Sequence, residues 1–464
     1  MDVLNKLLNY KINNTIFNLR LPDLTNERPG KTLMVWNKLA YWNIIDDDLK
    51  IFLMSFDGKN TLTEVINSNQ EWKDHYKTII QCVKTFIDKG VLYSSNKTIK
   101  ENQPNYKIEN ITVNITNKCN LSCFHCYYAE NLNNNISEVS GHEIALFLKL
   151  IRKHCANKPS LFLLGGEPLI VQEKLEPILF ESKKLGFKTN ISTNGTLINA
   201  NFIKLAQKHK FSVQVSLDGH DSETNDFIRG NGSFNKTIEN IKLLVNNNVN
   251  TILCMTCHKG NIDFIEKYYK LAKKLQVNEA RIIPLKIIGN AKIKNIIPST
   301  VSEIIKKCSS IFIKNNEYQK FSQTDTLSIL LNTCYYSEKR LSCGSGTQTL
   351  LIDADGAIYP CLNTNFNFLK IGNIKDRNFS FDHEWKNSNK LIDFRHNISM
   401  DNKLSECYNC NINNWCLGGC HGETYKLKES FLPKPYNCQD LKQSIIDSFW
   451  LISDFPVLLN TKKE

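Results

Sequence analysis

The chain has 464 residues, of which 41% are hydrophobic and 22% are charged. These proportions are typical of a globular protein that is large enough for several domains. No run of the sequence approaches the roughly 18 apolar residues of a membrane span, and the first residues lack the pattern of a secretion signal. We therefore expect a cytoplasmic protein that does not associate with membranes.

The formal net charge of +12 comes mostly from lysines that are spread along the chain. Such a distribution is typical of a solvated basic surface, and it also favours an acidic partner such as an acidic peptide. No nucleic-acid recognition motif with interleaved aromatic residues is present, so we expect no nucleic-acid partner.

The chain contains sixteen cysteines, an unusual number for a protein without an export signal. Cytosolic thiols stay reduced, so dense cysteine in such a chain indicates metal binding or catalysis before disulfides. Because thiolates are the usual protein ligands of iron–sulfur clusters, the spacing of the cysteines becomes the main question.

Residues 1–105 mix short strands with helices. The pattern predicts two strands around a turn over 31–45, followed by helices over 46–56, 61–68 and 73–89. Gly90 is placed to end the third helix, and 91–93 returns to strand. This order predicts a small winged-helix-like module, and the polar stretch 94–107 is typical of a linker.

Residues 106–330 alternate strand and helix, which predicts a parallel α/β architecture. Ser140 and Glu143 form a capping-box pattern at the start of the first helix. The expected strands are 108–116, 161–166, 188–193, 211–219, 251–259 and 281–289. Six strands without a seventh and an eighth predict a partial (β/α)6 TIM-type barrel, in which chemistry gathers after the C-terminal ends of the strands.

Three cysteines follow the first strand directly, with the spacing Cys119-x3-Cys123-x2-Cys126. Three thiolates can hold three irons of a cubane cluster and leave the fourth iron open to a substrate or cofactor. Taken alone, the same three residues could also be a zinc site that lacks one ligand.

This spacing, together with the segments after the next strands, resembles the radical SAM superfamily over roughly residues 108–330. Those segments are Gly165-Gly166-Glu167-Pro168, Ser192-Thr193-Asn194-Gly195, 215–219, Arg229-Gly230 and Gly289-Asn290-Ala291. The resemblance implies that S-adenosylmethionine (SAM) binds the open iron and that the Gly165–Glu167 region holds its amino group. It also implies that the 215–219 region contacts the ribose and that Phe124 and His125 contact the adenine. The cofactor-binding residues expected in this way are Phe124, His125, Gly165, Gly166, Glu167, Ser192, Asn194, Ser216, Asp218 and Arg229.

The strand–helix alternation stops in residues 331–464, where eight of the sixteen cysteines lie. Seven of them form an array that resembles the SPASM domain, which holds two auxiliary [4Fe–4S] clusters; the other possibility is a double zinc site. By this resemblance, the outer cluster takes Cys407, Cys410, Cys416 and Cys438, and the inner cluster takes Cys343, Cys361 and Cys420. Cys334 could supply the fourth inner ligand; otherwise that iron is open to substrate.

The N-terminal residues resemble the PqqD-like peptide-recognition element of peptide-modifying radical SAM enzymes, in pattern and not through an invariant motif. In that family a leader peptide adds a strand to an exposed sheet edge and packs against the third helix. Lys31, Lys38, Lys84 and Lys89 could favour an acidic leader. The alternatives are a module that only stabilises the barrel and a module that binds DNA.

Together these resemblances predict a maturase of a ribosomally synthesised peptide that uses a 5′-deoxyadenosyl radical and a flavodoxin- or ferredoxin-type electron donor. A Cys thioether is the expected product, followed by a carbon–carbon cross-link; epimerisation would need a hydrogen donor that the sequence does not identify. The alternative is an oxidase like the anaerobic sulfatase-maturating enzymes, in which Asp follows the inner-cluster Cys. Here Leu362 follows Cys361.

No catalytic side chain is predicted, and Cys254 and Cys257 are expected to pack on opposite faces of their strand.

Overall fold

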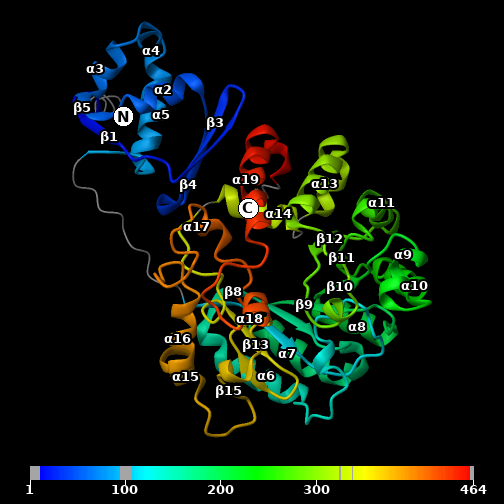
Figure 1. The fold of residues 1–464 in the computed structure, drawn as a ribbon. Helices are drawn as coiled ribbons and strands as arrows, with labels where there is room; N and C mark the ends of the chain where they lie inside the picture. The colour runs from blue at the N-terminus through cyan, green and yellow to red at the C-terminus, as the bar shows by residue number, and fades with distance from the viewer. Residues whose placement is uncertain (1–10, 95–105, 323–325, 337, 460–464) are drawn as a thin grey trace.

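The computed structural model describes residues 11–94, 106–322, 326–336 and 338–459. Its centre is a nine-stranded sheet with the order β12-β11-β10-β9-β8-β7-β13-β14-β15 (Figure 1). Six strands of this sheet, β7 to β12, are parallel and lie next to one another in sequence order. They are β7 (Ile108–Asn114), β8 (Cys155–Leu164), β9 (Lys188–Thr193), β10 (Ser212–Ser216), β11 (Thr251–Cys257) and β12 (Glu279–Pro284).

Helices alternate with these strands, as the sequence predicts. They are α6 (Gly141–Ile151), α7 (Leu175–Lys184), α8 (Ala200–His209), α9 (Ser222–Arg229), α10 (Ser233–Asn246) and α11 (Ile265–Leu275). The Ser140–Glu143 capping box forms at the start of α6. The partial parallel barrel is therefore confirmed, because each strand alternates with a helix that buries one apolar face on it.

The cysteine-rich C-terminal part of the chain continues the barrel sheet. Strand β13 (Thr349–Ile352) pairs in parallel with β7, and β14 (Ala357–Tyr359) and β15 (Gly372–Asn373) follow in antiparallel order. The predicted boundary at residue 331 thus separates two parts of one sheet. The remaining helices are α12 (Asn290–Ile293), α13 (Val301–Lys314), α14 (Thr326–Tyr335), α15 (Phe381–Asn387), α16 (Asn389–Asn397), α17 (Asn413–Cys416), α18 (His421–Lys428) and α19 (Cys438–Asp454).

The described N-terminal residues form two small sheets and, after a short helical stretch at 11–13, the helices α2 to α5. One sheet is the antiparallel meander β2 (Leu24–Arg28), β3 (Lys31–Trp36) and β4 (Tyr41–Asp46), and the other joins β1 (Ile16–Leu19), β5 (Asp57–Thr61) and β6 (Leu92–Tyr93). The helices are α2 (Asp47–Met54), α3 (Leu62–Asn67), α4 (Gln70–Asp74) and α5 (Tyr76–Asp88). The helix predicted over 73–89 is present as α5, but it begins at Tyr76, because His75 separates it from α4. Most of the predicted linker lies outside the described residues.

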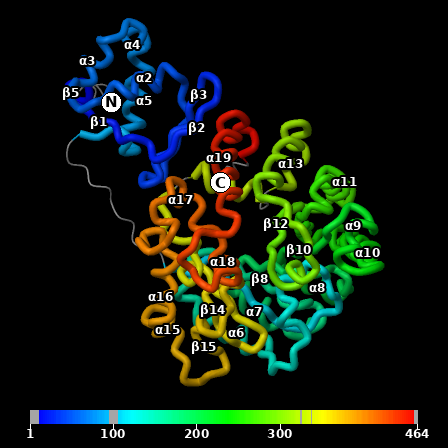
Figure 2. The backbone as a smooth tube through the Cα atoms, in the orientation of Figure 1, coloured from blue at the N-terminus to red at the C-terminus, as the bar shows by residue number. Residues whose placement is uncertain are grey.

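The middle strand β3 of this meander is buried on both faces because its residues alternate between two cores. Leu33 and Val35 belong to the main core of the chain, whereas Met34 and Trp36 belong to the core of the N-terminal module. This explains why β3 is a continuous apolar run and does not alternate with polar residues. Figure 2 shows the N-terminal trace meeting the C-terminal helix α19.

Trp42 on β4 is a central contact between the module and the rest of the chain. Its indole nitrogen donates to the Cys334 carbonyl at 2.8 Å, and its ring lies 4.7 Å from that of Phe449 on α19. Beside it, the Arg28 guanidinium lies 4.2 Å from the ring of Trp450, whose indole nitrogen donates to Asn26 at 2.9 Å. We therefore expect the module to be held rigidly on α19.

Replacing Trp42 by alanine is expected to weaken this attachment, because it removes the ring contact and the hydrogen bond together. Removal of a large packed aromatic side chain costs about 3 kcal/mol. Hydrogen exchange should then speed up in β4 and in α19, while exchange in β7–β12 stays unchanged. Trp42→Phe, which keeps a ring, is the matched control; equal exchange in all three proteins would contradict the assignment of Trp42 to this contact.

Within the described ranges, no helix combines the length and the apolar character that a membrane span requires.

Candidate active site

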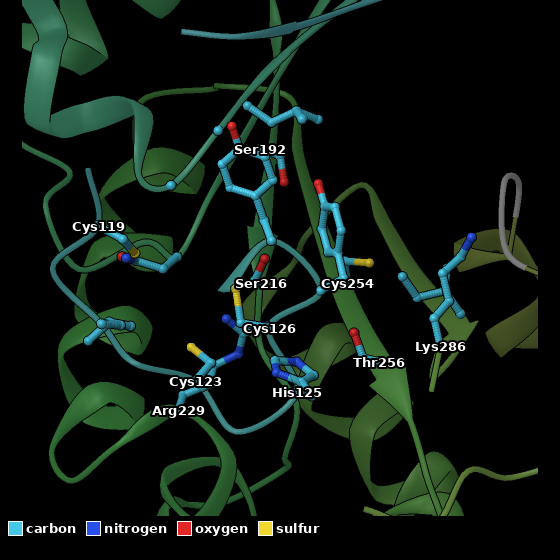
Figure 3. Close-up of a pocket in the computed structure, with 18 of the residues that line it drawn as sticks. Cys119, Cys123, His125, Cys126, Ser192, Ser216, Arg229, Cys254, Thr256 and Lys286 are labelled. Atoms are coloured by element: carbon cyan, nitrogen blue, oxygen red, sulfur yellow. The ribbon is translucent and has the colours of Figure 1, made fainter. Parts of the chain in front are cut away.

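A cavity of about 380 Å³ lies at the C-terminal ends of the barrel strands (Figure 3). Cys119, Cys123 and Cys126 line it from the loop after β7, and Leu362 and Asn363 line it from the C-terminal part of the chain. Further lining comes from the ends of β8 to β12, namely Gly165, Gly166, Ser192, Asn194, Gln214, Ser216, Cys254, Thr256, Pro284 and Lys286. The three cysteines and the predicted strand-end segments therefore share one space.

The cysteine loop is held from both sides by hydrogen bonds. The backbone of Cys119 donates to the Asn133 side chain at 3.1 Å. On the other side, Asn290 donates through its backbone to the Cys126 carbonyl at 3.0 Å and through its side chain to the Cys123 carbonyl at 3.1 Å. The Gly289–Ala291 segment, predicted to lie on the adenine side, thus supports the cysteine loop from the residues that follow β12.

The glycine pair after β8 lets the backbone of the same loop approach closely. A side-chain carbon on Gly166 would lie 2.2 Å from the Lys118 carbonyl oxygen, and one on Gly165 would lie 2.3 Å from that of Thr116. The backbone nitrogen of Glu167 donates to the Lys118 carbonyl at 2.8 Å. Glycine is required here because backbone fills the space that a Cβ would occupy.

Replacing Gly166 by alanine is expected to displace the residues just before Cys119 and so to lower the amount of iron that the protein binds. The measurement is iron per chain after anaerobic purification. Gly186→Ala is the control, because no atom lies within 4 Å of the new carbon there, even though Gly186, unlike Gly166, has a positive φ of 77°. Full iron content in Gly166→Ala would show that the loop tolerates the displacement.

Glu167 lies behind the wall of the cavity and does not line it. Its buried carboxylate accepts hydrogen bonds from the Thr193 hydroxyl at 2.6 Å, the Asn194 backbone at 2.7 Å and the Leu169 backbone at 3.1 Å. Burial raises the pKa of Glu167 although these donors favour the charged form. The structure therefore places Glu167 where it fixes Asn194, which does line the cavity.

Asp218 is also fully buried behind the wall. Its carboxylate forms ion pairs with Arg229 Nε at 2.7 Å and with His125 Nε2 at 2.8 Å, and it accepts a hydrogen bond from the Thr256 backbone at 2.8 Å. Burial alone would raise the pKa of Asp218, but Arg229 and His125 hold it well below its usual range. Asp218 thus remains charged and orients three residues that face the cavity.

Seven of the ten predicted cofactor-binding residues line the cavity, and three do not. The lining residues are His125, Gly165, Gly166, Ser192, Asn194, Ser216 and Arg229. Phe124 is half-exposed and contacts Phe227 edge to face at 6.0 Å, while Glu167 and Asp218 lie in the second layer described above. The binding roles of all ten stay predictions.

Several lining residues were missed by the sequence reasoning. Gln214 lies with the predicted Ser216 on the face of β10 that alternates with buried valines, and Cys254 and Thr256 share one face of β11. This period-two pattern of polar residues was a usable signal. The expected packing role suits Cys257, which is fully buried away from the cavity, but Cys254 lines the cavity and that prediction needs correction.

The cysteines at this site fit an iron–sulfur cluster. Burial raises the pKa of Cys119 to about 11 and also raises the pKa of Cys123 and of Cys126, so metal binding must displace protons. In the described ranges no three His, Cys, Asp or Glu side chains converge as ligands of a single metal ion. A cubane takes one thiolate at each of three separate irons, and three thiols of one loop that face one cavity match that requirement.

Contacts among the C-terminal cysteines are consistent with the two groups that the SPASM resemblance implies, and the ligand roles stay predictions. Burial and the neighbouring thiols of Cys361 and Cys420 together raise the pKa of Cys343 to about 12. Burial likewise raises the pKa of Cys407 to about 11, with further contributions from Cys410 and Cys438. Cys416 belongs with the second group, because the neighbouring thiols of Cys407 and Cys410 contribute, together with burial, to raising its pKa. Cys334 is buried in the core on α14, and its ligand role stays a prediction.

Comparison with known proteins identifies both domains. A model described as the radical SAM superfamily matches residues 113–272, and a model of the SPASM iron–sulfur cluster-binding domain matches residues 343–411. The chain therefore contains a radical SAM domain and a SPASM domain, and it is a radical SAM enzyme for which [4Fe–4S] clusters are expected.

Among its relatives is a cysteine-type anaerobic sulfatase-maturating enzyme of Clostridium novyi, which is 28% identical over 70% of this chain and 91% of the relative. The structure of anSMEcpe with bound AdoMet has a TM-score of 0.59 at 22% identity and covers 75% of this chain and 98% of that protein. Streptococcus suis SuiB bound to its precursor peptide SuiA has a TM-score of 0.57 at 17% identity and covers 91% of this chain and 98% of that protein. At these identities the two structures show a shared fold.

Proposed function

We propose that this enzyme modifies a ribosomally synthesised peptide whose leader binds the N-terminal module, and that it installs a cross-link, foremost a Cys thioether. The comparisons contain a relative of the sulfatase-maturating type and a neighbour that holds a precursor peptide. Because these two comparisons support both kinds of activity, the choice of a peptide substrate with a leader rests on the N-terminal module. Its supporting observation is that β2 and β4 each pair with β3 alone within the described residues, so that both outer edges of the meander are open to a further strand.

The β4 edge suits the proposed leader better than the β2 edge. The Lys89 ammonium, at the end of α5, lies 5.7 Å from the ring of Tyr41 at the start of β4. A peptide on this edge would thus meet both a positive charge and helix α5. Lys31, by contrast, lies 3.9 Å from Asp454 and is partly neutralised.

When bound, SAM and the reduced cluster would supply a 5′-deoxyadenosyl radical that removes hydrogen from unactivated carbon. Cys119, Cys123 and Cys126 would hold that cluster. His125, Asn194, Ser216 and Arg229 line the space in which SAM would lie. Leu362 and Asn363 cover this space from the SPASM side, where they help to exclude water from the reaction.

A second candidate is oxidation of a Cys or Ser in a protein substrate, as the name of the C. novyi relative suggests. In that group of enzymes an Asp is expected after the inner-cluster cysteine. Leu362 occupies that position here and lines the cavity, where it offers no group that could take a proton. This position is the residue-level difference that separates the two candidates.

The deciding experiment is co-expression with a Cys-containing peptide encoded beside this gene, followed by mass spectrometry. A thioether or carbon–carbon cross-link removes two hydrogens for each linkage, whereas epimerisation leaves the mass unchanged and takes up deuterium from the solvent. An aldehyde in place of the Cys side chain would support the second candidate. Unmodified peptide, with SAM cleavage intact, would contradict the proposal.

Binding of the leader can be tested separately by fluorescence anisotropy with the full chain and a labelled acidic leader. Reversing two charges in Lys84→Glu/Lys89→Glu is expected to weaken binding about tenfold, which corresponds to about 1.4 kcal/mol. The matched control is Lys77→Glu, an exposed lysine at the opposite end of α5. Equal weakening by the control would indicate only a general charge effect.

A further inference from the structure

Lys286 connects the active-site cavity with the inner auxiliary group of cysteines. It follows β12 by two residues and lines the cavity, where Figure 3 shows it across from Cys119. Its ammonium lies 2.7 Å from the Glu423 carboxylate and 3.7 Å from the Cys420 sulfur. One lysine of the radical SAM domain therefore touches both a carboxylate and a proposed cluster ligand of the SPASM domain.

An ion pair fixes the position of this lysine, because its ammonium lies within 2.7 Å of the Glu423 carboxylate. Glu423 lies on α18, three residues after Cys420, and its side chain is only 10% exposed. The carboxylate thus neutralises part of the lysine charge and holds the ammonium against the sulfur.

We propose that Lys286 is a positioning residue that raises the reduction potential of the inner auxiliary cluster, and that Glu423 opposes this effect. Reduction adds one negative charge to a cluster. A fixed positive charge beside one of its sulfur ligands stabilises the reduced form, and a fixed negative charge destabilises it. Glu423 is only 10% exposed and is little screened by solvent, whereas the Lys286 side chain is 35% exposed and is screened more. The proposal rests on the assignment of Cys343, Cys361 and Cys420 to one cluster.

In the proposed function this potential matters because the inner cluster would accept the electron left on the peptide after hydrogen removal and bond formation. For a thioether, one hydrogen atom would go to the 5′-deoxyadenosyl radical and the Cys thiol would release its proton to solvent. The carbon–sulfur bond would form as one electron passes from the substrate radical to the cluster. A higher potential favours that transfer, and the lysine stands between the space where SAM would lie and the cluster that accepts the electron.

The test is a redox titration, followed by electron paramagnetic resonance, of the reconstituted full chain. Cys119, Cys123 and Cys126 are all replaced by alanine in this background so that only the auxiliary clusters give signals. Lys286→Met is expected to lower the midpoint potential of one auxiliary cluster by about 59 mV, a tenfold change in the reduced-to-oxidised ratio for one electron. Glu423→Gln is expected to raise it, and Lys286→Arg should stay close to the parent.

Lys426→Met is the matched control, since it removes an exposed positive charge from the same helix α18. Opposite shifts in Lys286→Met and Glu423→Gln support the proposal, because a merely structural role would not reverse the sign. No shift beyond that of the control, or shifts of the same sign, would overturn it. If Lys286→Met fails to hold the inner cluster, Glu423→Gln tests the proposal by itself: a raised midpoint potential supports it, and a lowered or unchanged one overturns it. The titration uses no peptide, so its result is independent of whether the proposed substrate is correct.

Discussion

Replacing Cys123 by alanine is expected to abolish the reductive cleavage of SAM and to remove about four iron atoms from each chain. Cys123 lies in the middle of the cysteine loop and lines the cavity, and its carbonyl is held by Asn290 at 3.1 Å. The loop backbone should therefore keep its place in the variant, while the cluster loses one of its three protein ligands. Two thiolates are too few to hold a cubane against solvent and reductant.

The measurements are iron content after anaerobic reconstitution and the amount of 5′-deoxyadenosine formed with dithionite. The variant should retain the iron of the auxiliary clusters, because none of their predicted ligands lies in this loop. Cys155→Ala is the control, since Cys155 is buried at the start of β8 and is not among the cavity residues. Full iron content and normal SAM cleavage in Cys123→Ala would remove the basis for the proposed chemistry.

Asp218→Ala is expected to destabilise the radical SAM domain by about 3–5 kcal/mol, because it leaves a buried positive charge without its partner. The carboxylate binds Arg229 at 2.7 Å, and the Arg229 side chain is only 9% exposed. The same change releases His125, so SAM binding should weaken in whatever protein remains folded. Urea unfolding and SAM titration measure the two effects.

Asp221→Ala is the matched control for this prediction. Asp221 lies three residues away and caps α9 through the Thr224 backbone at 2.9 Å, but it is half-exposed. Loss of such a cap costs only about 1 kcal/mol. Equal destabilisation by the two changes would show that the buried ion pairs of Asp218 add nothing beyond a surface cap.

The effect of Asp218 should also depend on pH in a defined direction. In the folded protein the pKa of Asp218 is held well below its usual range, while in the unfolded chain it takes the ordinary value of about 4. The stability that the carboxylate contributes is therefore complete above about pH 4 and is lost as the pH falls toward the folded pKa. The difference in unfolding free energy between the natural protein and Asp218→Asn should shrink below that pH; a difference that is constant from pH 7 to pH 3 would contradict this.

The local elements of this fold were predictable because they rest on short-range patterns. Apolar strands alternating with amphipathic helices indicated the six barrel strands β7 to β12, and the Ser140–Glu143 pair marked the start of α6. The strands β1 and β5 were not predicted, since their sequences IFNL and DGKNT lack a clear period-two pattern of apolar residues. The break at His75 was missed because nothing in the sequence interrupts the helical pattern there.

For the candidate site, too, the sequence predicted some features and not others. The cysteine spacing and the strand-end glycines indicated which segments meet, because parallel strands bring their C-terminal ends to one edge of the sheet. The depth of each side chain was not predictable: Glu167 and Asp218 lie behind the cavity wall, where each fixes residues that face it. Which carboxylates are buried depends on packing against neighbouring strands, and that is not written in either segment alone.

The sequence by itself therefore determined the order of the domains, the parallel strands and the three-cysteine loop, since each of these depends on residues close together in the chain. The tertiary structure alone decided that β13 extends the barrel sheet beside β7, that Trp42 rests on α19, and that Lys286 meets Glu423 and Cys420. Those contacts join residues that are more than a hundred positions apart. Their free energy comes from burying apolar surface and pairing charges across elements, and no local pattern records which partner a given face will meet.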